Sequence, residues 1–183
     1  MKQGAVLIAN HKSHKDGFFI PMLLFPRRVF VLVTRKWYDK RFLKPLFERL
    51  PYIPIDLTQP DASWMSAAEE ALKKGKCVLI FPEGKLERNG KHEPFNSGFL
   101  LPVKHLGVPV IPMAIKGDYR LFHRQMLVVG KPERIELNQK GRLSAILHTA
   151  SEQCEREVFC LAEEADDERK NEELEELIDS PLS

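Results

Sequence analysis

Short apolar runs alternate along the chain with segments of helical spacing, and this alternation constrains the fold more than any other feature. Short runs of β-branched or aliphatic residues, each followed by a polar segment, are typical of buried strands. Three such runs are Ala5–Ala9, Val29–Thr34 and Val78–Phe81. The same pattern predicts further strands at 52–55, 108–115 and 126–129, and helices at 18–25, 39–50, 61–74, 95–105 and from 143 onward. Strands that alternate with helices predict an α/β fold with a mostly parallel central sheet covered by helices on both faces.

Length and charge divide the chain unequally. Its 183 residues suit one domain, which we place at 1–162, followed by an acidic tail at 163–183. Residues 163–179 hold ten Asp or Glu against Arg169 and Lys170, so the rest of the chain is strongly basic although the net charge is only +2. A basic body suits a phosphate ligand or an anionic membrane. We do not expect nucleic acid, since the basic residues lack an aromatic stacking platform.

The cysteines and the apolar stretches argue against a disulfide-bonded, a metal-binding and a membrane-spanning protein. Cys77, Cys154 and Cys160 are odd in number and lack metal-ligand spacing, which favours a reducing compartment and no metal site. The longest apolar stretch, residues 17–26, is about half the length that a membrane-spanning helix needs. We therefore expect no transmembrane helix.

In a parallel sheet the chemistry lies at the carboxyl ends of the strands, which directs attention to the loop after the first strand. This loop reads Asn-His-Lys-Ser-His-Lys-Asp and places His11 five residues before Asp16. A carboxylate bonded to one ring nitrogen would leave the other free to accept a proton, and a substrate hydroxyl could be the nucleophile. Two alternatives stay open: His11 and Asp16 form a helix-capping pair, or His14 is the functional histidine.

A second polar loop follows the strand at 78–81. It contains Glu83, Gly84, Lys85 and Arg88. Glycine permits a close backbone approach to a ligand, and the two cations could neutralise a phosphate. The alternative is an ordinary solvated loop with a turn glycine.

The two loops resemble the signatures of one known family. Residues 10–16 are similar to the N-H-x-S-x-x-D motif of the glycerolipid acyltransferases, which include the lysophosphatidate acyltransferases. Residues 81–84 match the F-P-E-G motif of that family, and residues 108–112 match its V-P-V-I-P block. Lys36, followed by Pro45, resembles the lysine and proline between the first two motifs. These blocks occur in the family's order.

The resemblance implies a reaction and a set of site residues. His11 would deprotonate the acceptor hydroxyl, and Asp16 would orient its ring. The substrate-binding positions that it implies are Asn10, Ser13, Lys36, Glu83 and Gly84, with Lys85 or Arg88 in place of a phosphate-binding arginine. Acyl-CoA or acyl carrier protein would be the acyl donor, a lysophospholipid-type acceptor would be the acyl acceptor, and no cofactor or metal would take part. Residues 1–162 would then be an acyltransferase domain of phospholipid biosynthesis.

Two departures bear on the acceptor. The family often continues F-P-E-G with T-R-S, where this chain has Lys85, Leu86 and Glu87. An I-D-R triplet that holds acceptor phosphate is here Ile55, Asp56 and Leu57. Both differences weaken the case for 1-acylglycerol-3-phosphate as the acceptor. A thioester or lipid hydrolase and an inactive lipid-binding member of the family stay open as alternatives.

The segment at 18–25 carries an expectation about location. Its apolar residues lie in the sequence beside Arg27, Arg28, Arg35 and Lys36. Apolar side chains bordered by cations suit the surface of an anionic membrane, although the phenylalanines could equally be core. We expect a cytoplasmic protein that binds peripherally to the cytoplasmic face of a membrane.

Overall fold

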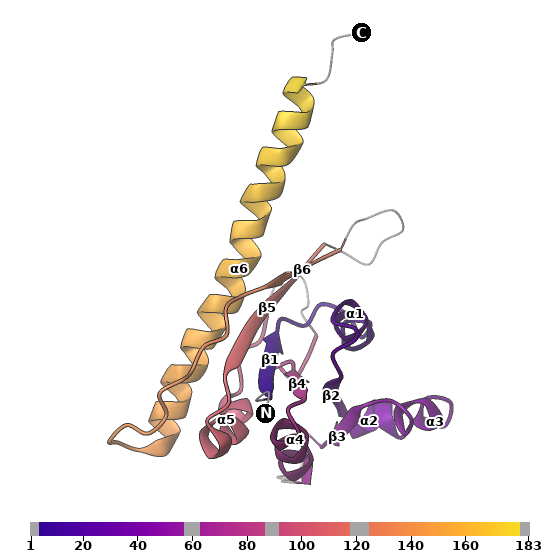
Figure 1. Cartoon of the computed structure of the whole chain (residues 1–183), viewed down its shortest axis with the longest axis vertical. Coiled ribbons are helices and arrows are strands. Elements are labelled where there is room, and N and C mark those ends of the chain that lie inside the picture. Colours follow the sequence, from indigo (N-terminus) through magenta and orange to yellow (C-terminus); the bar gives the residue numbers. More distant parts are fainter. Residues whose placement is uncertain (1–3, 57–62, 87–91, 118–124, 180–183) are drawn as a thin grey trace.

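A six-stranded sheet organises the molecule. The computed structural model describes residues 4–56, 63–86, 92–117 and 125–179, and the side chains of the last helix as far as residue 164. The strand order is β3-β2-β4-β1-β5-β6 (Figure 1). The strands are β1 (Ala5–Ala9), β2 (Val29–Thr34), β3 (Tyr52–Ile55), β4 (Cys77–Ile80), β5 (Val110–Lys116) and β6 (Met126–Val129). Only the β5–β6 pairing is antiparallel among these strands, so the expected mostly parallel sheet is confirmed.

Strand β1 is the structural centre of the sheet. It pairs in parallel with β4 on one side and with β5 on the other, and all five of its residues are buried. Its side chains alternate between the faces, so Val6 and Ile8 enter one apolar cluster while Ala5, Leu7 and Ala9 enter the other. A strand buried on both faces accounts for the continuous apolar run in the sequence.

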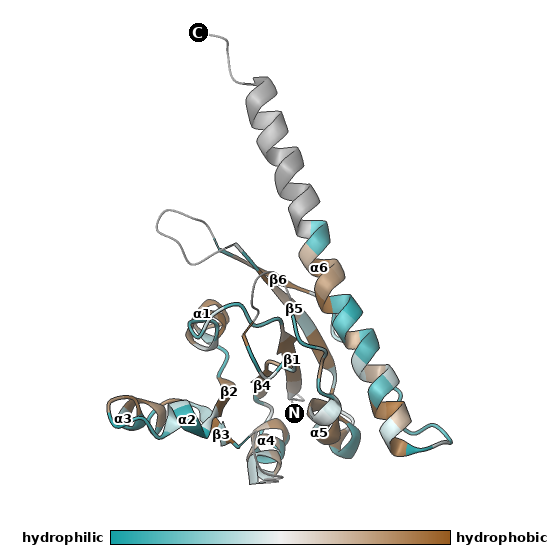
Figure 2. Ribbon diagram, turned by 180° about the vertical axis from the view of Figure 1, so that it is seen from behind, coloured by the Kyte–Doolittle hydropathy of each residue, from teal (hydrophilic) through white to brown (hydrophobic). Residues whose placement is uncertain are grey.

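Helices cover the two faces unequally. The larger cluster packs under α4 (Ser63–Lys73), α5 (Leu100–Leu106) and α6 (Leu143–Asp179). The opposite face is covered by α1 (Asp16–Leu23), which contributes the buried Ile20. Figure 2 shows the strands as predominantly hydrophobic ribbons and α6 with hydrophobic and hydrophilic residues interspersed. Both faces are covered, as the sequence predicts.

The region between β2 and β3 differs from the expected helix at 39–50. It holds two single-turn helices, α2 (Arg35–Tyr38) and α3 (Lys44–Phe47), separated by turns. Of the apolar residues expected on one buried face, only Phe47 is buried, while Phe42, Leu46 and Leu50 are exposed. Similarly, the helix expected at 95–105 begins as a 3₁₀ turn at Ser97–Phe99, where the Asn96 side chain accepts a hydrogen bond from the Gly98 N–H.

Three further expectations concern the cysteines, a membrane-spanning helix and the boundary of the acidic tail. Cys77, Cys154 and Cys160 are all free thiols. No helix in the described residues combines the length and apolarity needed to cross a bilayer. Helix α6 continues through residue 162, where we place the boundary between the domain and the tail; that boundary stays a prediction.

Candidate active site

The sheet brings the two polar loops together. Strand β1 pairs with β4 so that Ile8 lies opposite Ile80, where β4 ends, and β1 ends one residue later at Ala9. The loop at 10–16 and the turn at 81–84 therefore leave the same edge of the sheet side by side. This juxtaposition follows from parallel pairing.

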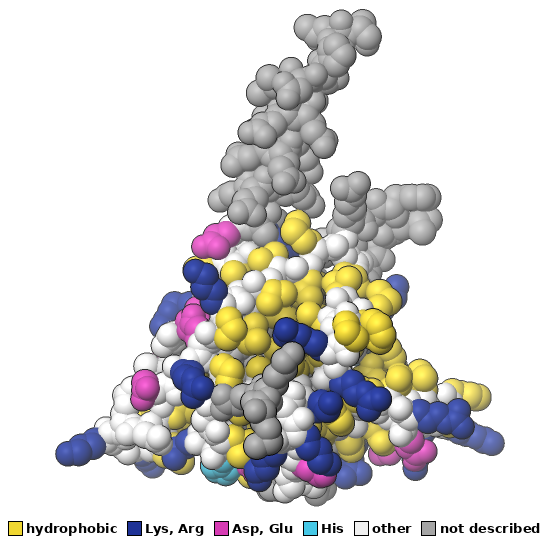
Figure 3. All heavy atoms as spheres, viewed as in Figure 1, with side chains coloured by type: hydrophobic (Ala, Val, Ile, Leu, Met, Phe, Trp, Pro, Cys, Tyr) yellow, Lys and Arg dark blue, Asp and Glu magenta, His cyan; other side chains and the backbone are white. Residues whose placement is uncertain are grey.

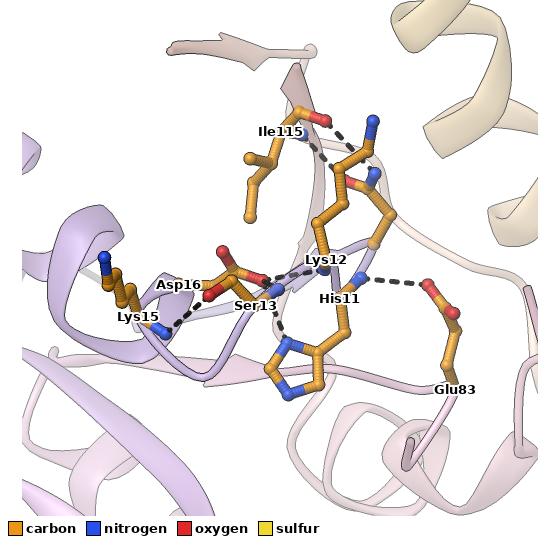
Figure 4. A network of polar contacts seen from close by, with 8 residues as sticks. His11, Lys12, Ser13, Lys15, Asp16, Glu83 and Ile115 are labelled. Carbon is orange, nitrogen blue, oxygen red and sulfur yellow. Dashed lines mark hydrogen bonds and ion pairs between the residues drawn. The ribbon is translucent and has the colours of Figure 1, made fainter. Parts of the chain in front are cut away.

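The loop after β1 folds back on itself around the Asp16 carboxylate. Asp16 is the first residue of α1 and is fully buried, with its Oδ2 atom 3.0 Å from His11 Nδ1. The same oxygen accepts hydrogen bonds from the backbone N–H groups of Lys12 and Ser13, both at 2.8 Å (Figure 4). An ionised carboxylate oxygen only accepts hydrogen bonds, so this contact assigns the His11 ring proton to Nδ1. Its other ring nitrogen points away from the carboxylate and is available as a base (Figure 4).

The turn after β4 holds the backbone of His11. Pro82 and Gly84 occupy the second and fourth positions of a turn closed by the Gly84 N–H on the Phe81 carbonyl at 3.1 Å, the arrangement that type I turns favour. Glu83 is buried, and its Oε1 atom accepts a hydrogen bond from the His11 N–H at 2.9 Å. This contact positions the histidine, and the acceptor-binding role that the resemblance implies for Glu83 stays a prediction.

Aromatic rings border the imidazole. The Phe81 ring stacks on the His11 ring with centroids 4.2 Å apart and an interplanar angle of 18°. His14 instead packs against Trp37, whose other neighbour is the Lys40 ammonium, 3.3 Å from the ring centroid. Burial, followed by the nearby His11 and Lys40, lowers the pKa of His14 below its usual value. The described hydrogen bonds give a carboxylate partner to His11, whereas His14 packs on an aromatic ring, and this geometry favours His11 over His14 as the candidate base.

Asn10 ties the loop to the neighbouring strand. Its side chain is buried and makes two hydrogen bonds to the backbone of Ile115 in β5, donating at 3.2 Å and accepting at 2.7 Å. The paired bonds continue the β1–β5 ladder beyond the end of β1. Asn10 therefore fixes where the loop begins, and the substrate contact that the resemblance implies for it stays a prediction.

A cavity of about 290 Å³ opens beside His11. Apolar residues make up most of its wall, and they come from β2, the ends of β3 and β4, α1, and the segment around α2 and α3. Tyr52 donates a hydrogen bond from its hydroxyl to the Gly17 carbonyl at 3.0 Å, joining β3 to α1 across the cavity. Burial raises the pKa of Tyr52 to about 12, so the donor stays protonated. The volume is near the lower end of ligand pockets, about 300–1,000 Å³.

The remaining candidate residues lie at different distances from this cavity. Gly84, with φ of 66°, and Lys85 line it, and Lys85 forms an exposed ion pair with Glu93 at 3.4 Å. Lys36 is exposed on α2 and does not line the cavity, and the Ser13 hydroxyl accepts a hydrogen bond from the Lys15 N–H. Arg88, like Leu57, lies outside the described residues. Binding roles for these residues stay predictions.

The sequence reasoning missed the aromatic part of the site. Phe81 belongs to the F-P-E-G block, but nothing in the motif indicates that its ring stacks on His11. Trp37 and Tyr52 line the cavity from segments that carry no motif. An aromatic residue directly after a buried strand, next to a catalytic loop, is the one available signal.

Comparison with known proteins places these observations in a family. The sequence model of the family described as "Acyltransferase" matches residues 1–116, which is well over half of the chain. The chain belongs to the acyltransferase family. The matched segment contains both loops, the cavity and strands β1 to β5 of this family member.

Curated relatives of this acyltransferase-family chain share one name. The 1-acyl-sn-glycerol-3-phosphate acyltransferase of Cocos nucifera is 31% identical over 134 residues, which is 68% of this chain and 41% of the relative. The enzyme of that name from Pseudomonas aeruginosa is 32% identical over 117 residues, covering 60% and 43% of the two chains. The chain thus spans less than half the length of these relatives.

A solved structure agrees on the fold. The crystal structure of the 1-acyl-sn-glycerophosphate (LPA) acyltransferase PlsC from Thermotoga maritima superposes with a TM-score of 0.58 at 21% identity. The match covers 85% of this acyltransferase-family chain and 67% of the other. The predicted architecture is therefore found in a member with a determined structure.

Proposed function

We propose that the chain transfers an acyl group from a thioester donor to a hydroxyl of a 1-acylglycerol-3-phosphate-type acceptor, with His11 as the general base. The observation that carries the proposal is the contact of His11 Nδ1 with the buried Asp16 carboxylate, which leaves the second ring nitrogen beside an apolar cavity. The name shared by the curated relatives supports the class of acceptor.

The reaction needs one proton carrier. The free ring nitrogen of His11 removes the proton of the acceptor hydroxyl as its oxygen attacks the thioester carbonyl carbon. The C–S bond then breaks, the ester is formed, and the imidazolium returns the proton to the leaving thiolate. Asp16 stabilises the imidazolium between the two steps. The thioester is a co-substrate, acyl-CoA or acyl carrier protein, and no cofactor takes part in the proposed steps.

The cavity suits the acyl chain of the donor. Its lining is mostly apolar, and His11, Gly84 and Lys85 lie among the lining residues, so a chain inside it would present its thioester near the base. The exposed Lys85 ammonium could exchange Glu93 for the phosphate of the acceptor. Lysine contacts a phosphate as a point charge, in contrast to the bidentate arginine.

The test is transfer by the purified full chain from labelled acyl-CoA and labelled acyl carrier protein to a panel of lysolipids. We expect labelled diacyl product with 1-acylglycerol-3-phosphate and at least a 10²-fold lower rate for His11→Ala, since a general base contributes about 10²–10⁴-fold. The matched control is His148→Ala, which removes an exposed histidine of α6 and should keep the wild-type rate.

Other outcomes contradict the proposal in different ways. Release of free fatty acid without acylated lipid would make the protein a hydrolase. Lipid binding without turnover would make it an inactive, lipid-binding family member. A His14→Ala variant that loses turnover, while His11→Ala keeps it, would move the base to His14.

A further inference from the structure

Large apolar side chains are exposed on both sides of the cavity. On the α1 side, Met22 is 68% and Phe25 is 81% exposed; on the α3 side, Phe42 is 92% exposed and Leu46 is 44% exposed. Folding does not bury these side chains, although each has the size and apolarity of a core residue. Clustered exposure of this kind marks an interaction site.

Cations surround these side chains. Residues 18–50 hold eight Lys or Arg against Asp39 and Glu48. Arg27 and Arg28 come shortly after Phe25 in the chain, and Arg41 and Lys44 lie on either side of Phe42 in the sequence. All four are exposed. Figure 3 shows hydrophobic and Lys or Arg side chains interspersed over the end of the molecule that carries α1, α2 and α3.

The two apolar groups are joined through the cavity wall. The Phe18 ring of α1 stacks near the Phe47 ring of α3, with centroids 6.1 Å apart, and both rings line the cavity. Met22 lies one turn after Phe18 on the same face of α1, and Leu46 precedes Phe47. The exposed side chains therefore extend outward from the walls of the cavity itself.

We propose that this surface, formed by α1 with the turn after it and by the α2–α3 segment, docks on an anionic lipid bilayer. The apolar side chains enter the interface and the cations meet anionic headgroups. Docking in this orientation places the cavity at the membrane, where acyl chains and lysolipid are found. The value of this placement for acyl transfer rests on the proposed function, whereas the docking itself does not.

Charge selects a membrane over a protein partner as the occupant. The core of a protein interface is depleted of charged residues, whereas residues 18–50 carry eight cations against two carboxylates, a net charge of +6. Lys36, Lys40 and Lys44 are exposed beside the apolar side chains. Long cationic side chains that border apolar ones are typical of interfacial segments.

The experiment is co-sedimentation of the full chain with phosphatidylcholine vesicles, with and without phosphatidylglycerol. We expect much stronger partitioning onto the anionic vesicles and weakening by added salt. The double variants Phe25→Ser/Phe42→Ser and Arg41→Glu/Lys44→Glu should each lower the partition coefficient at least tenfold, since one cation near an anionic surface contributes about fivefold. Because the replaced side chains are exposed, circular dichroism and thermal unfolding should match wild type.

Matched controls lie outside the proposed docking surface, on β6 and just before α6. Met126→Ser/Val129→Ser removes exposed apolar side chains of β6, and Lys140→Glu/Arg142→Glu makes the same charge change before α6. Both controls should bind as wild type does. Equal loss in the controls, equal binding of wild type to both kinds of vesicle, or concentration-dependent self-association abolished by Phe42→Ser without vesicle binding would overturn the proposal.

One further variant separates this proposal from the proposed function. His11→Ala should bind anionic vesicles as wild type does, and the docking variants should keep acyl transfer to lysolipid dispersed in detergent. Normal transfer with no vesicle binding would refute docking alone. Normal vesicle binding with no transfer by wild type would refute the enzymatic proposal alone.

Discussion

At the residue scale, a single oxygen atom organises the candidate site. Asp16 Oδ2 accepts hydrogen bonds from the Lys12 and Ser13 backbone and from the His11 ring, all within 3.0 Å. The two backbone bonds shape the loop, and the third orients the base, so folding and chemistry depend on the same carboxylate. A helix-capping pair would satisfy the backbone but would not require the imidazole contact.

Replacing Asp16 by Asn tests this double role. The amide oxygen can still accept hydrogen bonds from the loop, but the amide is neutral and no longer stabilises an imidazolium. We expect acyl transfer to fall by about 10²–10⁴-fold, with a smaller loss of thermal stability. Steady-state kinetics and thermal unfolding measure the two effects, with the exposed Asp39→Asn as the control. A folded Asp16→Asn variant with near-normal rate would contradict the proposed role.

The three cysteines should differ in reactivity. Cys154 is fully buried in α6, which raises the pKa of its thiol to about 12, and half-burial also raises the pKa of Cys77. Cys160 is exposed. Because the thiolate is the reactive form, iodoacetamide at mildly alkaline pH should label Cys160 first and Cys154 last, as read by peptide mass spectrometry. In concentrated guanidinium chloride the labelling rates of the three cysteines should converge. If Cys154 of the native protein were labelled as fast as Cys160, the burial of Cys154 in α6 would not protect it, contrary to this prediction.

At the scale of elements, strands were easier to predict than short helices. The runs that form β1, β2 and β4 are buried through continuous apolar sequence, and their pairing follows from parallel topology. The segment from 39 to 50 also has helical spacing, yet it forms only the single turn of α3. Its apolar residues Phe42 and Leu46 lie at the surface, so no buried face extends the helix. Periodicity cannot distinguish a core face from an exposed binding face.

Gly4, just before β1, lies so close to the end of α4 that we expect it not to tolerate a side chain. A Cβ atom at Gly4 would lie 2.5 Å from the backbone oxygens of both Leu72 and Lys76. Gly4→Ala should therefore lower the free energy of unfolding by about 1–3 kcal/mol, measured by urea denaturation, because backbone must shift to admit the methyl group. The control is Gly17→Ala in α1, where the nearest atom is 3.6 Å away, and we expect no loss there. Similar stabilities for the two variants would contradict the contact.

At the scale of the whole molecule, the sequence predicts where the site lies better than what it contains. The motifs and the rule for parallel sheets place His11 beside the turn of Glu83 before any coordinates are known. The cavity is different, since most of its lining residues lie between Gly17 and Tyr52 and match no motif. Asn10 and Glu83 show a second limit: a motif marks them as functional, but only contacts show that they hold backbone.

The shape of the cavity should determine which acyl chains are transferred. Val33 of β2 lines the cavity, and a phenylalanine there would occupy part of its 290 Å³. A long chain would then lose burial or force the wall apart, while a short chain would still fit. We expect Val33→Phe to lower kcat/KM for long acyl donors more than for short ones, measured with a series of saturated acyl thioesters.

The chain-length profile distinguishes this effect from a general loss of activity. Val129→Phe, on the exposed face of β6, adds the same ring away from the cavity and should leave the profile of wild type unchanged. Burial of each methylene stabilises a bound chain by about 0.8 kcal/mol, so excluding two methylenes should change the ratio of long to short donors by more than tenfold. An equal fall for every donor would mean that the acyl chain binds elsewhere, and the cavity would then lose its proposed role even if His11 kept its own.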